Sequence, residues 1–207
     1  NGDGLSELLI GDPNVNAGKG RAYLLLGRRT WPASINLSNG ADWRISPTTT
    51  LAFGGSVASG GDLDGDGLSE VLIGAASEGG AYEPVYVYFG RERGVPATYS
   101  RIYGRACIIP PCTAPLMPDI AGVGDTNGDG LSDFLMATNL IVSLINGRSR
   151  PEWPTSALAS VNSIARLQGD GQQQRVSSVG DVNEDGLRDM LIGDPMPGVS
   201  RVYVLFG

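Results

Sequence analysis

The sequence predicts an all-β fold made of β-propeller blades of four antiparallel strands, with about three and a half to four blades in its 207 residues. Three observations predict this fold. Short apolar runs alternate with turn residues, and a nine-residue acidic motif recurs about every 60 residues. The 31 glycines and 13 prolines also interrupt the chain too often for the long helices of a bundle. A hydrophobic content of 41% is sufficient for a buried core.

The acidic motif occurs three times in full and once in part. The complete copies begin at Asp62, Asp125 and Asp181 and read DLDGDGLSE, DTNGDGLSD and DVNEDGLRD. The chain opens within a fourth copy, NGDGLSE at residues 1–7. Repetition on this scale is typical of an array of similar supersecondary units. We expect a single domain with units at approximately 1–47, 48–106, 107–162 and 163–207.

Each unit shows the same order of short segments around its motif. A first strand is expected before each complete motif, for example at 53–58 and 175–179. A second strand follows the motif at 8–10, 71–74, 134–137 and 190–193. A third strand ends in glycine, at 22–27, 85–90, 140–147 and 202–207. A fourth, less patterned strand fits after the third, for example at 101–103, so we expect the first unit to lack its first strand and the last unit its fourth.

The motif has the chemistry of a calcium site. Oxygen-bearing side chains occupy positions 1, 3, 5 and 9, and a glycine at position 6 permits a sharp turn. The leucine at position 7 can offer its carbonyl oxygen, and we expect its side chain to pack beneath its own loop. Such a set suits a hard cation and no soft metal. The expected ligands of three complete sites and one truncated site are Asp62, Asp64, Asp66, Leu68, Glu70; Asp125, Asn127, Asp129, Leu131, Asp133; Asp181, Asn183, Asp185, Leu187, Asp189; and Asn1, Asp3, Leu5, Glu7.

The alternative interpretation is a hairpin turn rich in Asp, Asn and Gly that binds no metal. Against it, three or four carboxylates within nine residues repel one another unless a cation is present. The charge of the chain agrees with a metal site. The net charge is −7, and the proposed ligands include 12 of the 22 acidic residues. Without them, the 15 basic residues would outnumber the remaining acidic ones.

The segment FGGSVASGGDLDGDGLSEVLIGA at 53–75, followed by VYVYFG at 85–90, resembles an FG-GAP repeat, the blade unit of the N-terminal propeller of integrin α chains. The resemblance extends over essentially the whole chain. It implies a ring of usually seven blades, with calcium in the hairpin between the first two strands of some blades. The third unit departs from the pattern, because it lacks the Phe-Gly opening and has Ala137-Thr-Asn after its second strand.

The composition excludes several classes of function. The sequence contains no histidine, which removes the commonest general base and most transition-metal sites. It also contains no nucleophile elbow, phosphate loop or dinucleotide fingerprint, so we expect no enzyme activity. The acidic balance argues against nucleic acid as a partner, and no apolar run is long enough to insert into a membrane.

We therefore expect an extracellular or cell-surface module for adhesion or recognition of a protein or glycan. The alternatives are a building block of an extracellular filament or coat, or an accessory domain of a secreted hydrolase or lyase. The missing blades of a ring would come from another chain or from a part of this protein outside the sequence. Cys107 and Cys112 flank two prolines at a spacing that suits a small disulfide loop, with two free thiols as the alternative. Asn36 begins a glycosylation sequon, which is a weak signal.

The partner surface is expected opposite the calcium loops. In a blade of antiparallel strands, the connections after strands one and three lie at one end and those after strand two and four lie at the other. The second end collects the connections whose lengths vary most, and variable loops on a rigid scaffold commonly bind partners. The expected ligand contacts are Lys19, Arg21, Tyr82 and Glu83, with solvated turns as the alternative.

Overall fold

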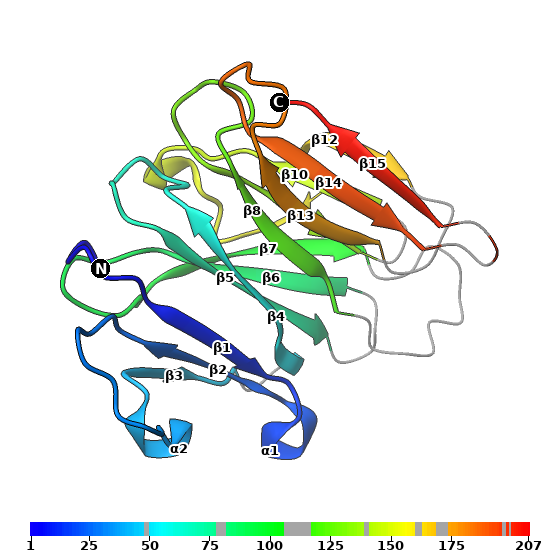
Figure 1. The fold of residues 1–207 in the computed structure, drawn as a ribbon. Helices are drawn as coiled ribbons and strands as arrows, with labels where there is room; N and C mark the ends of the chain where they lie inside the picture. Colours follow the sequence, from blue (N-terminus) through cyan, green and yellow to red (C-terminus); the bar gives the residue numbers. More distant parts are fainter. Residues whose placement is uncertain are drawn as a thin grey trace.

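The computed structural model describes residues 1–47, 50–77, 82–105, 117–138, 141–159, 163–168, 174–195, 198 and 200–207. Over these residues the chain is all-β, with two one-turn helices, α1 (Val15–Gly18) and α2 (Leu37–Gly40), and a short 3-10 turn, η1 (Arg150–Glu152). Figure 1 shows four sheets that follow one another in chain order across the molecule. No helix in the described part of the chain is long and apolar enough to cross a membrane.

Each sheet is named here by its order in the chain. Sheet 1 contains β1 (Leu8–Asp12), β2 (Arg21–Leu25) and β3 (Trp43–Ile45). Sheet 2 contains β4 (Thr50–Gly61), β5 (Glu70–Ser77), β6 (Tyr82–Tyr88) and β7 (Tyr99–Arg105). Sheet 3 contains β8 (Asp119–Gly124), β9 (Asp133–Ala137), β10 (Ile141–Ile145) and β12 (Ser163–Gln168). Sheet 4 contains β13 (Arg175–Gly180), β14 (Asp189–Asp194) and β15 (Arg201–Leu205).

Within each of these four sheets the strands lie side by side in chain order. All pairs within these four sets are antiparallel. One strand pairs differently. β11 (Ser156–Leu158) follows β10 of sheet 3 in the chain but pairs in parallel with β7 of sheet 2. The segment 147–158 therefore connects the two sheets.

The sheets pack face to face because their strands are apolar on both sides. On β6, Val85 and Val87 belong to the core between sheets 2 and 3, whereas Tyr86 and Tyr88 belong to the core between sheets 1 and 2. Alternation along a strand places these two sets on opposite faces. Since both sets are buried, sheet 2 is covered on both sides.

Glycines allow neighbouring sheets to approach one another closely, at β1 with β4 and at β4 with β8. A Cβ atom on Gly11 would lie 3.1 Å from Cα of Gly54, and one on Gly122 would lie 3.1 Å from Cα of Gly60. Real Cβ atoms rarely tolerate such contacts with backbone, so only glycine allows this approach. This packing brings β4 beside β1 and β8 beside β4, and it gathers the acidic loops along one side of the molecule (Figure 1).

Candidate metal centre

The three complete acidic motifs form the loops between the first and second strands of their sheets. Residues 62–69 connect β4 to β5, residues 125–132 connect β8 to β9, and residues 181–188 connect β13 to β14. Residues 1–7 precede β1, which is in the position of a second strand. We number these segments by their sheets, so that residues 1–7 form loop 1, residues 62–69 loop 2, residues 125–132 loop 3 and residues 181–188 loop 4.

Backbone N–H groups curl each complete loop around the side chain at position 1. The Asp62 carboxylate accepts a hydrogen bond from Gly67 N at 2.9 Å. Asp125 accepts one from Gly130 N and Asp181 one from Gly186 N, each at 2.8 Å. The glycines have φ of 83°, 85° and 92°, a backbone conformation that side chains with a Cβ resist. The glycine at position 6 is therefore required by the turn.

The curled loop brings carboxylates together. In loop 2, Asp62, Asp64 and Glu70 offer oxygens that all lie within 4.8 Å of one another. No other three His, Cys, Asp or Glu side chains among the described residues come this close together, and loops 3 and 4 have Asn in place of Asp64. An all-oxygen set of this kind fits Ca²⁺ and offers nothing for a soft metal. The residues present thus fit the metal that the motif predicts.

The carboxylate at position 9 ties the loop to the end of the third strand. Glu70 accepts hydrogen bonds from Leu63 N at 2.6 Å and from Gly90 N at 3.1 Å. Asp133 accepts from Thr126 N at 3.0 Å and from Gly147 N at 2.9 Å. Asp189 accepts from Val182 N at 2.6 Å and from Gly207 N at 3.1 Å. All three acidic side chains are buried, so this position is a structural clamp as well as a metal-ligand candidate.

Ionisation of these buried acids has a free-energy cost in the absence of a cation. Burial raises the pKa of Glu70 to about 7, even though its two backbone hydrogen bonds lower it, and the nearby Asp64 and Asp66 raise it further. Burial likewise raises the pKa of Asp133. Burial opposes ionisation of Asp125 as well, but N–H groups of the loop outweigh it and lower the pKa. A divalent cation would favour the ionised form of each group.

Comparison with known proteins identifies the unit that contains loop 2. The family model described as "FG-GAP repeat" matches residues 53–89, which run from β4 through loop 2 to the end of β6. The chain carries an FG-GAP repeat. This confirms the resemblance that the sequence motif indicated, and loops 1, 3 and 4 share the motif of the matched loop.

Integrin α chains are similar to this protein over most of its length. Integrin alpha-4 of Xenopus laevis is 29% identical over 171 residues, which is 73% of this chain and 14% of the relative. Integrin alpha-E of Homo sapiens is 30% identical over 159 residues, 70% of this chain and 13% of the relative. Integrin alpha-V of Gallus gallus is 29% identical over 175 residues, 78% of this chain and 16% of the relative. The chain thus spans about one seventh of the length of these relatives.

The leucine of each complete loop packs against the loop of the preceding sheet. A Cβ atom on Gly65 of loop 2 would lie 3.1 Å from Cδ2 of Leu131, and one on Gly2 would lie 3.1 Å from Cδ2 of Leu68. The leucine, which was expected beneath its own loop, thus also contacts the neighbouring loop. Backbone hydrogen bonds link the loops in the same direction, from Ser132 N to Asp62 O at 2.8 Å and from Arg188 N to Asp125 O at 3.0 Å. Neighbouring FG-GAP loops therefore support one another.

The side chain at position 3 distinguishes loop 2 from the other FG-GAP loops. Asn127 Nδ2 donates to Asp129 Oδ2 at 2.9 Å, and Asn183 Nδ2 donates to Asp185 Oδ2 at 2.7 Å. The carboxylate side chain of Asp64 has no N–H to donate. Instead, the guanidinium of Arg150 bonds the carboxylates of Asp64 and Asp66. Sequence reasoning missed Arg150, although the fourth carboxylate of loop 2 was a signal that a positive charge was needed nearby.

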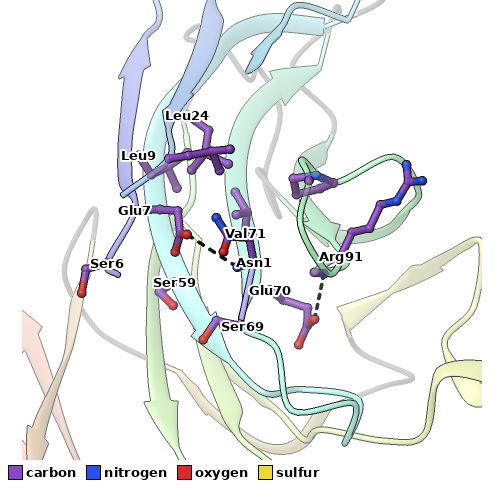
Figure 2. A pocket seen from close by; sticks show the side chains of 14 residues that line it. Asn1, Ser6, Glu7, Leu9, Leu24, Ser59, Ser69, Glu70, Val71 and Arg91 are labelled. Carbon is purple, nitrogen blue, oxygen red and sulfur yellow. Dashed lines mark hydrogen bonds and ion pairs between the residues drawn. The ribbon is translucent and has the colours of Figure 1, made fainter. Parts of the chain in front are cut away.

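Loop 1 lies beside a cavity of about 320 Å³ between sheets 1 and 2. Figure 2 shows Glu7 and Glu70 on opposite sides of this cavity, with Asn1 between them. The amino group of Asn1 lies 3.5 Å from Glu7 Oε1. Asn1 Oδ1 accepts a hydrogen bond from Asp3 N at 3.0 Å, and Asp3 accepts one from Leu5 N at 2.9 Å. Loop 1 therefore begins the same curl, with the residues of positions 3 to 9.

The residues expected to contact a partner lie at the other end of the sheets. Lys19 and Arg21 lie at the start of β2, and Tyr82 is 41% exposed at the start of β6. Glu83 is instead completely buried, so the expectation that it contacts a partner is wrong. The alternation of β6 turns Tyr82 and Glu83 to opposite faces of sheet 2. Cys107 and Cys112 lie outside the described residues.

Proposed function

We propose that this chain is a calcium-stabilised segment of an extracellular β-propeller that recognises a protein or glycan ligand and carries out no chemistry. The observation that carries the proposal is the repeated FG-GAP loop, which has a clamped, buried carboxylate at position 9 in all three complete copies. In loop 2 this carboxylate lies within 4.8 Å of oxygens at positions 1 and 3. The ligands proposed for Ca²⁺ are the residues at positions 1, 3, 5 and 9 and the carbonyl oxygen of position 7. The bound ion would supply positive charge to buried carboxylates.

The sheets have the features of propeller blades. Each lies face to face with the next, and glycines let β1 approach β4 and β4 approach β8 closely. Val85, Val87 and Phe89 of sheet 2 are covered by sheet 3. The corresponding residues of sheet 4, Val202, Val204 and Phe206, are 67%, 46% and 59% exposed. We propose that a further blade, from a larger protein or from another chain, covers this face.

The recognition surface is proposed at the end of the sheets opposite the FG-GAP loops. Lys19, Arg21 and Tyr82 lie there, on the two neighbouring sheets 1 and 2. The extracellular location rests on the similarity to integrin α chains and on calcium, which is abundant outside cells. The relatives give no ligand for this chain, so the class of ligand remains protein or glycan.

Thermal melting of the chain with and without calcium tests the proposed metal function. We expect chelation at neutral pH to lower the melting temperature and calcium, but not zinc, to restore it, because ionised carboxylates repel one another without the ion. The variant Asp129→Asn should reduce the calcium-dependent increase, whereas Asp42→Asn, a matched change outside the FG-GAP loops, should not. A melting temperature that does not respond to chelation would contradict the proposal.

A further inference from the structure

Arg150 reaches loop 2 from the neighbouring unit. It lies in η1, on the segment 147–158 that connects sheets 2 and 3. Its Nε bonds Asp64 Oδ2, and its Nη2 lies 3.2 Å from Asp66 Oδ2. Its guanidinium carbon lies 4.1 Å from the centre of the Phe89 ring, in the geometry of a cation–π contact. The aspartate side chain that it bonds, Asp64, is fully buried.

The segment that carries Arg150 is fixed on both sides. Arg148 N donates to Leu63 O at 2.8 Å, and the Trp153 indole donates to Arg148 O at 2.8 Å. The Trp153 ring also packs edge-on against Phe89, with 5.8 Å between the ring centres. These contacts hold the backbone of residues 148–153 against loop 2. The backbone that carries Arg150 is therefore held in place, and its guanidinium lies at a fixed position beside the carboxylates.

In loop 2, Arg150 donates the hydrogen bond that an asparagine side chain donates in loops 3 and 4. In those loops the amide at position 3 donates to Oδ2 of the aspartate at position 5. In loop 2, the same oxygen of Asp66 accepts from Arg150 instead. Loop 2 has four ligand carboxylates and the other two have three each. One guanidinium therefore brings the local charge of loop 2 to that of the others.

We propose that Arg150 is a built-in counter-cation of loop 2, which stabilises this loop without metal and makes it the weakest calcium site of the three complete FG-GAP loops. This inference rests on the proposed calcium function. A fixed positive charge beside the ligands repels a divalent cation and competes for the oxygens of Asp64 and Asp66. The loop with the most carboxylates is thus predicted to bind calcium less tightly than its neighbours. Arg150 is a positioning residue, since it acts through the carboxylates.

Calcium titration of the 207-residue chain, followed by the amide resonances of Gly67, Gly130 and Gly186, tests the proposal loop by loop. Each of these N–H groups donates to the position 1 carboxylate of its own loop. In the wild-type chain, Gly67 should reach its midpoint at a higher calcium concentration than Gly130 and Gly186. Arg150→Gln should lower the Gly67 midpoint on the order of tenfold, the Coulomb effect of one charge on a divalent ion at close range in water.

Three further variants separate charge from packing. Arg150→Lys keeps the charge and should leave the Gly67 midpoint near the wild-type value. Asp64→Asn removes the carboxylate that Arg150 Nε bonds and should reduce, without abolishing, the effect of Arg150→Gln, because the guanidinium charge still lies beside Asp66. Arg148→Gln is the control, since the Arg148 side chain donates to the carbonyl oxygen of Asn146 and lies over Trp153; it should leave the midpoint unchanged.

An unchanged or higher Gly67 midpoint in Arg150→Gln would overturn the role of Arg150. If this variant fails to fold, the wild-type titration still decides, because a Gly67 midpoint at or below those of Gly130 and Gly186 contradicts the proposal. If Gly130 and Gly186 respond to calcium while the Arg150 variants have no effect, only this inference fails. If none of the three resonances responds, the proposed calcium function fails together with it.

Discussion

Glu83 should make the fold less stable as the pH rises, and Glu83→Gln should remove this effect. Glu83 is completely buried on β6, and neither of its carboxylate oxygens has a hydrogen-bond partner among the described residues. It lies opposite Gly104 of β7, and the side chains of Met136 and Thr138 pack closely at Gly104. Burial raises the pKa of Glu83 from 4.5 to about 7.

The sign and size of the effect follow from the two pKa values. Between pH 4.5 and 7 the unfolded chain releases the proton of Glu83 while the folded chain keeps it, so stability falls over this range and levels off above it. A difference of about 2.5 pKa units corresponds to about 3 kcal/mol. Glu83→Gln should therefore be close to neutral at pH 4.5 and should stabilise the chain by about 3 kcal/mol at pH 8, or roughly 10 °C in melting temperature.

Melting of wild type and Glu83→Gln at pH values from 4.5 to 8, in a constant excess of calcium, measures this difference directly. Comparing the two chains at each pH cancels the contribution of Glu70, whose pKa is also raised to about 7. Glu92→Gln, a change of the same kind at an exposed position, serves as the control. A difference between wild type and Glu83→Gln that stays constant with pH, or that turns destabilising at pH 8, would refute the reasoning.

Three more outcomes are expected. Gly90→Ala should destabilise the chain by about 1–3 kcal/mol in thermal melts, because the added Cβ would lie 2.7 Å from Cβ of Leu68, in the loop that Gly90 helps to clamp; an unchanged melting temperature would contradict the clamp. The isolated chain should self-associate through the exposed face of β15. The double variant Val202→Lys, Val204→Lys should lower the mass measured by light scattering towards 21.6 kDa, whereas a wild-type chain that is already a stable 21.6 kDa monomer would contradict this expectation. Tyr82→Ala should leave calcium-dependent melting unchanged and should weaken binding of the chain to cells or matrix to which the wild-type chain binds. If binding weakens only in variants of the FG-GAP loops that remain folded, the partner surface lies at those loops instead.

Much of the fold follows from local patterns in the sequence. The apolar run after each acidic motif and the later run closed by glycine predicted the second and third strands, and both were found at nearly the expected positions. The curl of the loops also followed, because Gly67 and its equivalents need a positive φ. These features depend on residues close together in the chain.

The parts of the fold and of the metal site that the sequence did not predict depend on contacts between residues far apart in the chain. The parallel pairing of β11 with β7 joins residues more than 50 positions apart, and no local pattern marks it. Arg150 lies 86 positions from Asp64, so the extra carboxylate signalled a need for positive charge without indicating its source. Glu83 was expected at the partner surface because it belongs to a variable connection between strands, but it lies on β6 and the packing of sheet 3 on sheet 2 buries it.

Native mass spectrometry of the chain in calcium counts the ions that the FG-GAP loops bind. We expect three calcium ions per chain, held by loops 2, 3 and 4, with loop 1 adding a weaker fourth at high calcium. Asp129→Asn and Asp185→Asn should each remove one ion, while Asp42→Asn should remove none. A chain that carries no calcium at millimolar concentrations, or that loses no ion in either loop variant, would contradict the account.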